Sequence, residues 1–494
     1  MTRREGVDIV CESGAVATGP VEAAQAGADI LERGGNAMDA AAAACLACAV
    51  MEPQAVDLGG YVLAAVVLDA SANRVWSVDA NTVAPAAATS DMFRILPRRP
   101  GNGINEREYG VSVEDDANVH GPLATGVPGF LGGVGAIWER WGRLPWPEIV
   151  APARALVERG IPYSLIAGDV DFKREAIARF PATAAFLERH GETWYRPELA
   201  ATLAHLAATG WHDFYTGELG RKIVDFVASQ GGILTREDMA AFAPRFTDPC
   251  SATYRGAEVH TAIAPNGGFS VLGALAELAR EPVLSSTDPA YWQTVARALI
   301  RLWSARLADS PPPNPSPHGT VHVAAADRDG NLVSTTISQG GLFGACFAVP
   351  GTGIILSHGM CRFDPRPGSS NSVGPGKRPL NNVAPLLIRL RDRDVAMGTR
   401  GGRRIVSVSV QMVQRIVDDG ASPYQTATAP RIHTLTGDPL ELSANFDPAI
   451  RAALDRSGFR TEIPDEVAGA AHGAELRLDD RRIRAGGKTW AAGI

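Results

Sequence analysis

Residues 311–323 read Pro311-Pro312-Pro313-Asn314-Pro315-Ser316-Pro317-His318-Gly319-Thr320-Val321-His322-Val323. Proline lacks a backbone N–H and fixes φ, so the first part of this stretch predicts a linker that forms neither a helix nor an inner strand. From Thr320 the pattern alternates with period two until the turn signal Asp329-Gly330-Asn331, and a second strand-like run, Leu332 to Ser338, follows. The stretch therefore predicts a β-hairpin that begins at Thr320, directly after an exposed linker.

The Gly319-Thr320 junction has the residues that a self-cleaving enzyme with an N-terminal nucleophile needs. The Thr320 hydroxyl would attack the Gly319 carbonyl, and hydrolysis of the resulting ester would free the Thr320 amine as general base for the same hydroxyl. Most Gly-Thr pairs before a strand are ordinary loop ends. The rest of the chain has to decide between these interpretations.

Composition excludes several other classes of protein. The chain has 494 residues, of which 45% are hydrophobic, and a formal net charge of −7. It has no run rich in Lys or Arg, so nucleic acid is not an expected partner. Residues 1–14 carry several charges and no apolar core, which predicts no signal peptide. The longest apolar run, Ala40 to Met51, is too short to cross a bilayer and predicts a buried helix, so we expect no membrane partner.

The six cysteines are scattered along the chain: Cys11, Cys45, Cys48, Cys250, Cys346 and Cys361. Cys45 and Cys48 have the spacing of a C-x-x-C motif, but they lie in the apolar run without a second pair. We interpret them as packed small hydrophobes. The histidines and cysteines form no metal-ligand pattern, and we predict neither a metal nor another cofactor. Cysteine usage fits a cytoplasmic protein.

Periodicity outlines a sheet sandwich covered by helices. Residues 9–18 predict a strand, and a helix that opens at Pro20 and ends at Gly34-Gly35 follows. A second helix is expected over 38–51, and antiparallel strands over 61–68 and 75–79. Because strands lead and trail the chain with helical blocks between them, we expect two packed sheets with helices outside.

A series of motifs along nearly the whole chain resembles the γ-glutamyltransferase family, also called glutathione hydrolases. Any one of them is modest evidence, but their order is specific. They are Val21-Glu22-Ala23-Ala24-Gln25-Ala26-Gly27, Gly34-Gly35-Asn36-Ala37-Met38-Asp39-Ala40, Glu52-Pro53, Leu58-Gly59-Gly60, Ala124-Thr125-Gly126-Val127-Pro128-Gly129, Gly142-Arg143-Leu144-Pro145-Trp146, Gly374-Pro375-Gly376-Lys377-Arg378-Pro379-Leu380, Gly398-Thr399-Arg400-Gly401-Gly402 and Ala429-Pro430-Arg431-Ile432-His433.

The resemblance implies a four-layer αββα N-terminal-nucleophile hydrolase, an α/β (α+β) enzyme made as one chain that cuts itself in two. The family's nucleophilic threonine lies seven residues before the Asp of an Asp-x-Asp-Gly-Asn turn. Here Asp327-Arg328-Asp329-Gly330-Asn331 places it at Thr320. The implied pieces are a large subunit, 1–319, whose residues 309–319 form the processing linker, and a small subunit, 320–494. They would stay associated after cleavage.

The same resemblance implies the catalytic residues. Thr320 would be the nucleophile, and Ser338 replaces a family threonine that hydrogen-bonds the nucleophile. Gly401 and Gly402 match a glycine pair whose N–H groups form the oxyanion hole. The plain alternatives are a solvated strand end for Ser338 and a tight turn for the glycines. His322 could polarise the site, although we expect a packed, hydrogen-bonded histidine there.

The family's clamp for the glutamyl ammonium and carboxylate is altered in this chain. Asn81 stands where the family has an arginine, Arg362 where it has an acidic residue, and Asn381-Asn382 where it has Ser-Ser; Gly340 and Gly359 replace an asparagine and a glutamine. An arginine at 362 would repel an ammonium and attract a carboxylate. Asn381-Asn382 could still donate hydrogen bonds, or simply cap a turn. Arg400 and Arg403 could add to an anion site or lie idle at the surface.

We therefore predict a self-processing threonine amidohydrolase or acyltransferase that acts on a small amide through an acyl-Thr320 ester. Its acyl group would lack the glutamyl α-amine or carry its charges differently, so standard glutathione is not the expected substrate. Glutathione hydrolases, cephalosporin acylases, oxamate amidohydrolases and natural-product enzymes that break a carbon–carbon bond are precedents, and the sequence does not choose among them. The alternative is an uncut, non-catalytic binding protein, because the linker is shorter than the family's usual one. The sequence leaves open whether the protein forms a homo-oligomer.

Overall fold

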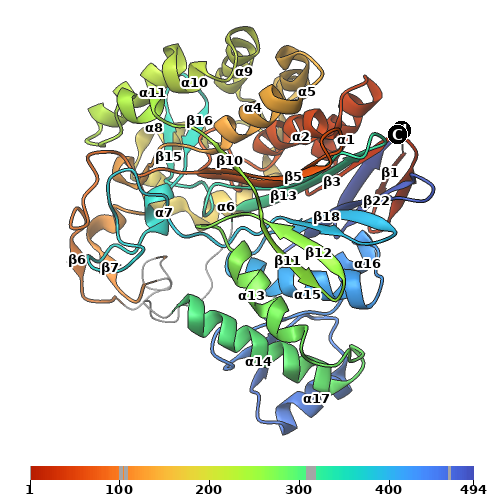
Figure 1. Ribbon diagram of the computed structural model, residues 1–494. Coiled ribbons are helices and arrows are strands. Elements are labelled where there is room, and N and C mark those ends of the chain that lie inside the picture. Colours follow the sequence, from red (N-terminus) through yellow and green to blue (C-terminus); the bar gives the residue numbers. More distant parts are fainter. Residues whose placement is uncertain (1, 100–103, 105–108, 308–318, 465–468) are drawn as a thin grey trace.

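The computed structural model describes residues 2–99, 104, 109–307, 319–464 and 469–494. Two antiparallel sheets lie face to face, and each carries helices on its outer face (Figure 1). This is the four-layer αββα arrangement that the resemblance implied. Apart from Gly319, the expected processing linker lies outside the described residues.

The first sheet has eight strands and holds the predicted hairpin. From edge to edge its strands are β1 (Thr2–Glu5), β24 (Trp490–Gly493), β3 (Gly14–Thr18), β13 (Thr320–Asp327), β14 (Leu332–Ser338), β4 (Val62–Asp69), β5 (Arg74–Asn81) and β10 (Arg245–Thr247). The hairpin prediction is confirmed, because β13 pairs with β14 in antiparallel register from Thr320↔Ser338 onward. Thr320 thus begins a strand near the centre of this sheet.

The second sheet has seven strands and packs against the first. Its order is β11 (Cys250–Tyr254), β12 (Ala257–Thr261), β17 (Leu386–Arg389), β18 (Arg393–Thr399), β22 (Ala471–Arg477), β23 (Ile483–Gly487) and β2 (Ile9–Cys11). The described residues also form three two-stranded sheets and one three-stranded sheet. The pairs are β6 (Ile95–Leu96) with β7 (Ser112–Val113), β8 (Ile161–Pro162) with β9 (Thr193–Trp194), and β15 (Phe347–Val349) with β16 (Ile354–Leu356); the three-stranded sheet is β19 (Ile432–His433), β20 (Leu440–Leu442) and β21 (Thr461–Glu462).

The helices form the two outer layers (Figure 1). Those on the side of the first sheet are α1 (Val21–Glu32), α2 (Ala37–Met51), α4 (Phe130–Trp141), α5 (Trp146–Arg159), α6 (Ala167–Phe172), α7 (Arg174–Ala178), α8 (Pro181–Phe186), α9 (Pro197–Thr209), α10 (Asp213–Thr216), α11 (Glu218–Ser229) and α12 (Arg236–Ala240). Those on the side of the second sheet are α13 (Gly268–Leu278), α14 (Pro289–Arg306), α15 (Arg404–Asp418), α16 (Pro423–Thr428) and α17 (Pro448–Arg456).

The apolar run that excluded a membrane span is the buried helix α2. All of its residues are buried, and Cys45 and Cys48 are free thiols among its packed alanines. Burial raises the pKa of both thiols, so they stay protonated and inert. Among the described residues, no helix has the length and apolar character needed to cross a membrane.

The prediction of one strand over residues 9–18 is wrong. The chain breaks at Glu12 and Ser13, so that β2 joins the second sheet and β3 the first. The N–H groups of Ser13 and Gly14 both donate to the Ile494 carbonyl, at 3.0 and 3.4 Å, instead of continuing a strand ladder. A local sequence pattern does not reveal such a transfer between sheets, because each half still has the composition of a strand.

The alternation of side chains along β13 places the side chain of Thr320 between the two sheets. Val321, Val323 and Ala325 pack under the helices of the outer layer, whereas Ala324 and Ala326 belong to the apolar cluster shared by both sheets. Successive side chains of a strand point to opposite faces. Thr320 and His322 therefore point toward the second sheet.

The side chain of His322 is packed between the two sheets. Its Nδ1 lies 3.0 Å from the Thr336 hydroxyl, and burial lowers its pKa to about 3, so the ring is neutral. The ring lies against Gly398 of β18, where a Cβ would overlap it. These contacts fit the packed, hydrogen-bonded histidine that we expected.

We expect a Gly398→Ala substitution to lower the free energy of unfolding by about 1–3 kcal/mol, because the methyl group forces the sheets or the ring apart. Thermal unfolding would measure it as a lower Tm. The matched control is Gly273→Ala in α13, where an added Cβ meets open space and helix propensity favours alanine by roughly 0.5–1 kcal/mol. Equal Tm values for the two variants would contradict the close packing of the ring.

Candidate active site

Thr320 and Ser338 face each other at the open end of the hairpin. They are direct partners in the β13–β14 register, and their hydroxyl oxygens lie 3.0 Å apart. Both side chains are buried. The predicted nucleophile and its predicted partner are therefore in hydrogen-bonding contact, and the replacement of threonine by serine at 338 retains the hydroxyl that this contact needs.

The carbonyl of Gly319, in the peptide bond before Thr320, is surrounded by donors. The Ser338 hydroxyl donates to this oxygen, and the N–H groups of Gln339 and Gly340 lie 3.2 and 3.3 Å from it. Because the Ser338 proton points at the carbonyl, the Thr320 hydroxyl is the donor in the Thr320–Ser338 bond, which leaves the lone pairs of Thr320 Oγ1 available. Donors on a carbonyl oxygen stabilise the negative charge that develops there when a nucleophile attacks.

Gly340 has the backbone that this arrangement requires. Its φ is +96°, a conformation that favours glycine, and its N–H also lies 2.9 Å from Ser338 Oγ. The segment is held from both sides, since the Gln339 N–H donates to the Ala55 carbonyl and the Gln339 side chain to the Ile355 carbonyl, each at 2.8 Å. The imidazole of His358 covers Gly340, where a Cβ would lie 2.6 Å from its Cδ2.

Gly401 and Gly402 form the turn between β18 and α15. Both have positive φ, +136° and +57°, and their carbonyls accept from the N–H groups of Arg404 and Ile405 at 3.1 and 3.2 Å. The turn that served as the plain alternative is thus present. It also places the pair at the positive end of a 15-residue helix, which is a favourable place for a developing anion.

A small cavity of about 60 Å³ is lined in part by Arg403, the residue that directly follows this glycine pair. Three residues singled out from the sequence, Arg362, Asn382 and Arg403, line it together. The sequence analysis did not single out Arg306, the last residue of α14, which lines the same cavity. The full lining is Tyr109, Trp303, Arg306, Leu307, Arg362, Asn371, Leu380, Asn382 and Arg403.

The comparisons with known proteins agree with this geometry. The family model described as Gamma-glutamyltranspeptidase matches residues 23–309 and 283–493. The chain belongs to this family. Members are hydrolases and transferases of the N-terminal-nucleophile type, so the protein is an enzyme of that type.

The similar proteins include both acylases and glutathione hydrolases. The chain is 31% identical to the Acylase ACY 1 proenzyme of Pseudomonas sp. (strain SE83), over 96% of this chain and 92% of the relative. It is 27% identical to the Glutathione hydrolase proenzyme of Pseudomonas aeruginosa, over 98% and 94%. The crystal structure of cephalosporin acylase from Bacillus halodurans superimposes with a TM-score of 0.85 at 25% identity and covers 99% of this chain and 97% of that one.

The residues at the altered clamp positions do not all lie at the same place in the structure. Arg362 and Asn382 line the cavity, whereas the buried side chain of Asn81 donates to the Pro379 carbonyl at 2.9 Å and so fixes the loop before Asn381. The amide oxygen of Asn381 accepts from the Val383 N–H at 3.1 Å, as in the capped turn that we considered. Gly359 lies in the short helical turn Gly359–Arg362.

Arg400 does not line the cavity that Arg403 lines. Its guanidinium lies 3.5 Å from the carboxylate of Glu52, a half-buried side chain. Burial raises the pKa of Glu52, and the Arg400 charge lowers it again. The two arginines that flank the glycine pair thus have different surroundings, which the sequence alone does not distinguish.

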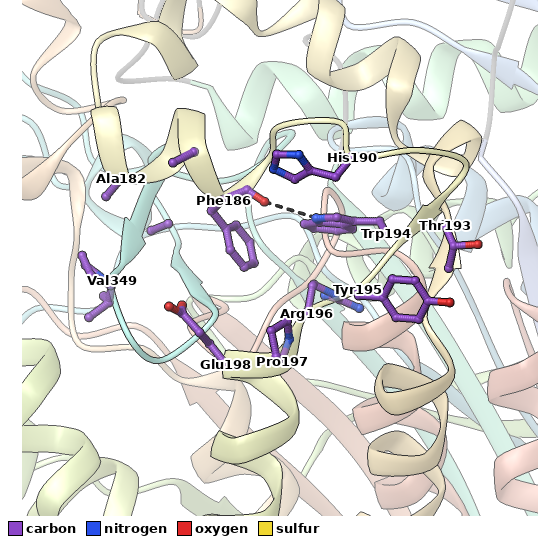
Figure 2. A pocket seen from close by; sticks show the side chains of 13 residues that line it. Ala182, Phe186, His190, Thr193, Trp194, Tyr195, Arg196, Pro197, Glu198 and Val349 are labelled. Atoms are coloured by element: carbon purple, nitrogen blue, oxygen red, sulfur yellow. Dashed lines mark hydrogen bonds between the residues drawn. The ribbon is translucent and has the colours of Figure 1, made fainter.

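A larger cavity of about 550 Å³ lies elsewhere in the helical layer. It is formed by α8, the start of α9 and the β15–β16 hairpin, and Phe186, Trp194 and Tyr195 give it an apolar wall (Figure 2). The indole N–H of Trp194 donates to the Phe186 carbonyl, as the dashed line in Figure 2 shows. No residue that the sequence analysis assigned to catalysis lines it. Within the described residues no cluster of three or more His, Cys, Asp or Glu forms a metal site.

Proposed function

We propose that this family member cuts itself between Gly319 and Thr320 and then transfers the acyl group of a small amide to water or to an amine through an acyl-Thr320 ester. The observation that carries the proposal is the Gly319 carbonyl, which sits among three donors beside a hydroxyl whose lone pairs are available. Thr320 is the proposed nucleophile, and Ser338 is its proposed hydrogen-bonding partner.

Self-cleavage would proceed by an N-to-O acyl shift. Thr320 Oγ1 bonds to the Gly319 carbonyl carbon, the Gly319–Thr320 C–N bond breaks, and the hydroxyl proton ends on the Thr320 nitrogen. Water then hydrolyses the ester, which yields the Gly319 carboxylate and restores the Thr320 hydroxyl beside a free amine. The Gln339 and Gly340 N–H groups and the Ser338 hydroxyl would stabilise the oxyanion of the first step.

Turnover would reuse the same hydroxyl with a new base. The freed Thr320 amine takes the hydroxyl proton while the oxygen attacks the substrate amide, and it returns the proton to the leaving amine. The N–H groups of Gly401 and Gly402 are the proposed oxyanion hole for this step. Similarity to both an acylase proenzyme and glutathione hydrolase proenzymes supports amide chemistry. The altered clamp argues that the acyl group differs from the γ-glutamyl group of glutathione.

A denaturing gel and intact-mass measurement test this function on the purified protein. We expect fragments of 319 and 175 residues, the second from 494 − 319, with Thr320 at the new N-terminus. Brief incubation with a panel of small amides should add the mass of one acyl group to the smaller fragment. A single uncut chain that gains no acyl mass would contradict the proposal and favour the non-catalytic binding protein.

A further inference from the structure

Asp57 is a buried carboxylate close to the segment that surrounds the Gly319 carbonyl. Asp57 Oδ1 accepts from the Ile355 N–H at 3.2 Å, and the Ile355 carbonyl accepts from the Gln339 side chain at 2.8 Å. The backbone of Ile355, in β16, therefore joins the carboxylate to Gln339. The N–H group of Gln339 in turn lies 3.2 Å from the Gly319 carbonyl.

A second connection runs through the backbone of the loop that carries Asp57. The Ala55 carbonyl accepts from the Gln339 N–H at 2.8 Å, and the Tyr61 N–H donates to the Ser338 carbonyl at 3.0 Å. The two ends of this loop thus hold two residues whose donors contact the carbonyl at the proposed cleavage point. Donors stabilise an oxyanion only when they are aimed at its position, so a shift of the loop would weaken them.

Arg196 is the cation that compensates this carboxylate. Its buried guanidinium donates to the Val50 carbonyl near the end of α2, and burial lowers its pKa only to about 10, so it stays charged at neutral pH. Within the described residues, Arg196 Nη1 and Asp57 Oδ2 have no hydrogen-bond partner, so the two groups interact through their charges. Burial raises the pKa of Asp57 to about 7, and the Arg196 charge opposes this rise. The carboxyl group therefore ionises within the physiological pH range.

We infer that Asp57 is a positioning residue for self-cleavage, and that its ionised carboxylate holds Gln339 in place through the backbone of Ile355. The inference rests on the proposed function. A hydrogen bond to an ionised acceptor is roughly twice as strong as one between neutral groups. Protonation of Asp57 would therefore loosen β16 and, with it, the donor at the Gly319 carbonyl. Self-cleavage should become faster as the pH rises through the titration of Asp57.

Several other titratable groups lie on the elements next to Asp57. Glu52, at the end of α2, also has a pKa raised by burial, whereas burial holds the pKa of His358, just after β16, well below its ordinary value. The Cys48 thiol of α2 stays protonated because burial raises its pKa, and Glu198 of α9 is exposed. All of these groups are the same in the wild type and in an Asp57→Asn variant. The ratio of the two cleavage rates therefore isolates Asp57.

The test measures cleavage of uncut chains that come from brief cell-free synthesis and are transferred to buffers from about pH 5.5 to about pH 8.5. Asp57→Asn keeps the oxygen that faces the Ile355 N–H and lacks the charge at every pH. We expect closely similar rates for wild type and variant at the lowest pH, and a wild-type rate about tenfold higher at the highest, with a midpoint near pH 7. A ratio that stays constant over this range would overturn the inference, because a purely structural loss does not follow the titration.

Two further variants test the connection on either side of Asp57. Arg196→Met removes the cation that favours the ionised carboxylate, so the midpoint should move to a higher pH. Gln339→Met removes the side-chain bond to the Ile355 carbonyl, and in this background Asp57→Asn should change the cleavage rate no further. A midpoint that stays in place, or losses that simply add in the double variant, would overturn the inference.

The matched control is Asp447→Asn at the exposed N-cap of α17. Its carboxylate also accepts from backbone N–H groups, those of Ala449 and Ile450 at 2.7 and 3.2 Å, but it lies outside the network around Gln339. It should cleave at the wild-type rate at every pH. Failure of the proposed function looks different, since the wild-type chain would then stay uncut at every pH.

Discussion

A Thr320→Ala chain is expected to remain one uncut polypeptide of 494 residues and to hydrolyse small amides at less than roughly 10⁻⁴ of the wild-type rate. The substitution removes the only hydroxyl that the proposal uses as nucleophile, and without cleavage the residue never gains a free amine to act as base. The Gly319 carbonyl keeps its donors, so a loss of cleavage would report the missing nucleophile and not a lost oxyanion site. Denaturing gels over time measure cleavage, and anilide release measures turnover.

Thr320→Ser is the matched control for this prediction. It retains the hydroxyl that lies 3.0 Å from Ser338 and removes only a methyl group from the buried side chain. We expect it to cleave and to turn over substrate, both more slowly than the wild type because a serine side chain is less constrained in rotation. If the alanine chain still splits after Gly319, or still consumes substrate at the wild-type rate, another group is the nucleophile.

Sequence patterns predicted the hairpin of β13 and β14 to within a residue because two independent signals coincide there. The linker prolines stop at Pro317, two residues before Gly319-Thr320 ends the linker, and the Asp-Gly turn fixes the register, so the strand ends are set on both sides. Residues 9–18 carry no comparable interruption, and only the hydrogen bonds to Ile494, at the far end of the chain, divide that segment between two sheets. A break of this kind depends on tertiary partners and is invisible to a local pattern.

In the candidate site, too, the sequence indicated some residues, whereas others depend on tertiary contacts. Arg362 and Asn382 could be singled out because family positions had changed in character, and Arg403 because it flanks the glycine pair; all three line one cavity. A changed position does not tell where a side chain points, as Asn81 shows by donating to the Pro379 carbonyl. Arg306 was not singled out, since its place in the cavity wall arises from the packing of the end of α14 against the backbone of Asn381. Its charge, just before the linker, was the signal that the sequence offered.

The geometry separates the groups that would serve the two chemical steps. The Gln339 and Gly340 N–H groups contact the Gly319 carbonyl in the uncut chain. The Gly401 and Gly402 turn lies at the start of α15, on the other sheet's helical layer. If self-cleavage and turnover use different donor pairs, a substitution at one pair should slow one step far more than the other.

We expect Gly340→Ala to slow self-cleavage by roughly 10²–10³-fold, the usual cost of removing one oxyanion donor. Its φ of +96° disfavours alanine, and the new Cβ would lie 2.6 Å from the His358 ring, so the N–H must move away from the Gly319 carbonyl. Chains that have cut should hydrolyse amides with a smaller loss, because Gly401 and Gly402 are untouched. Gly351→Ala is the control: it has a φ of +71° with open space around it, so it carries similar backbone strain away from the site and should cleave normally. Cleavage of the Gly340 variant at the wild-type rate, measured by gel time courses beside this control, would show that its N–H group has no part in the step.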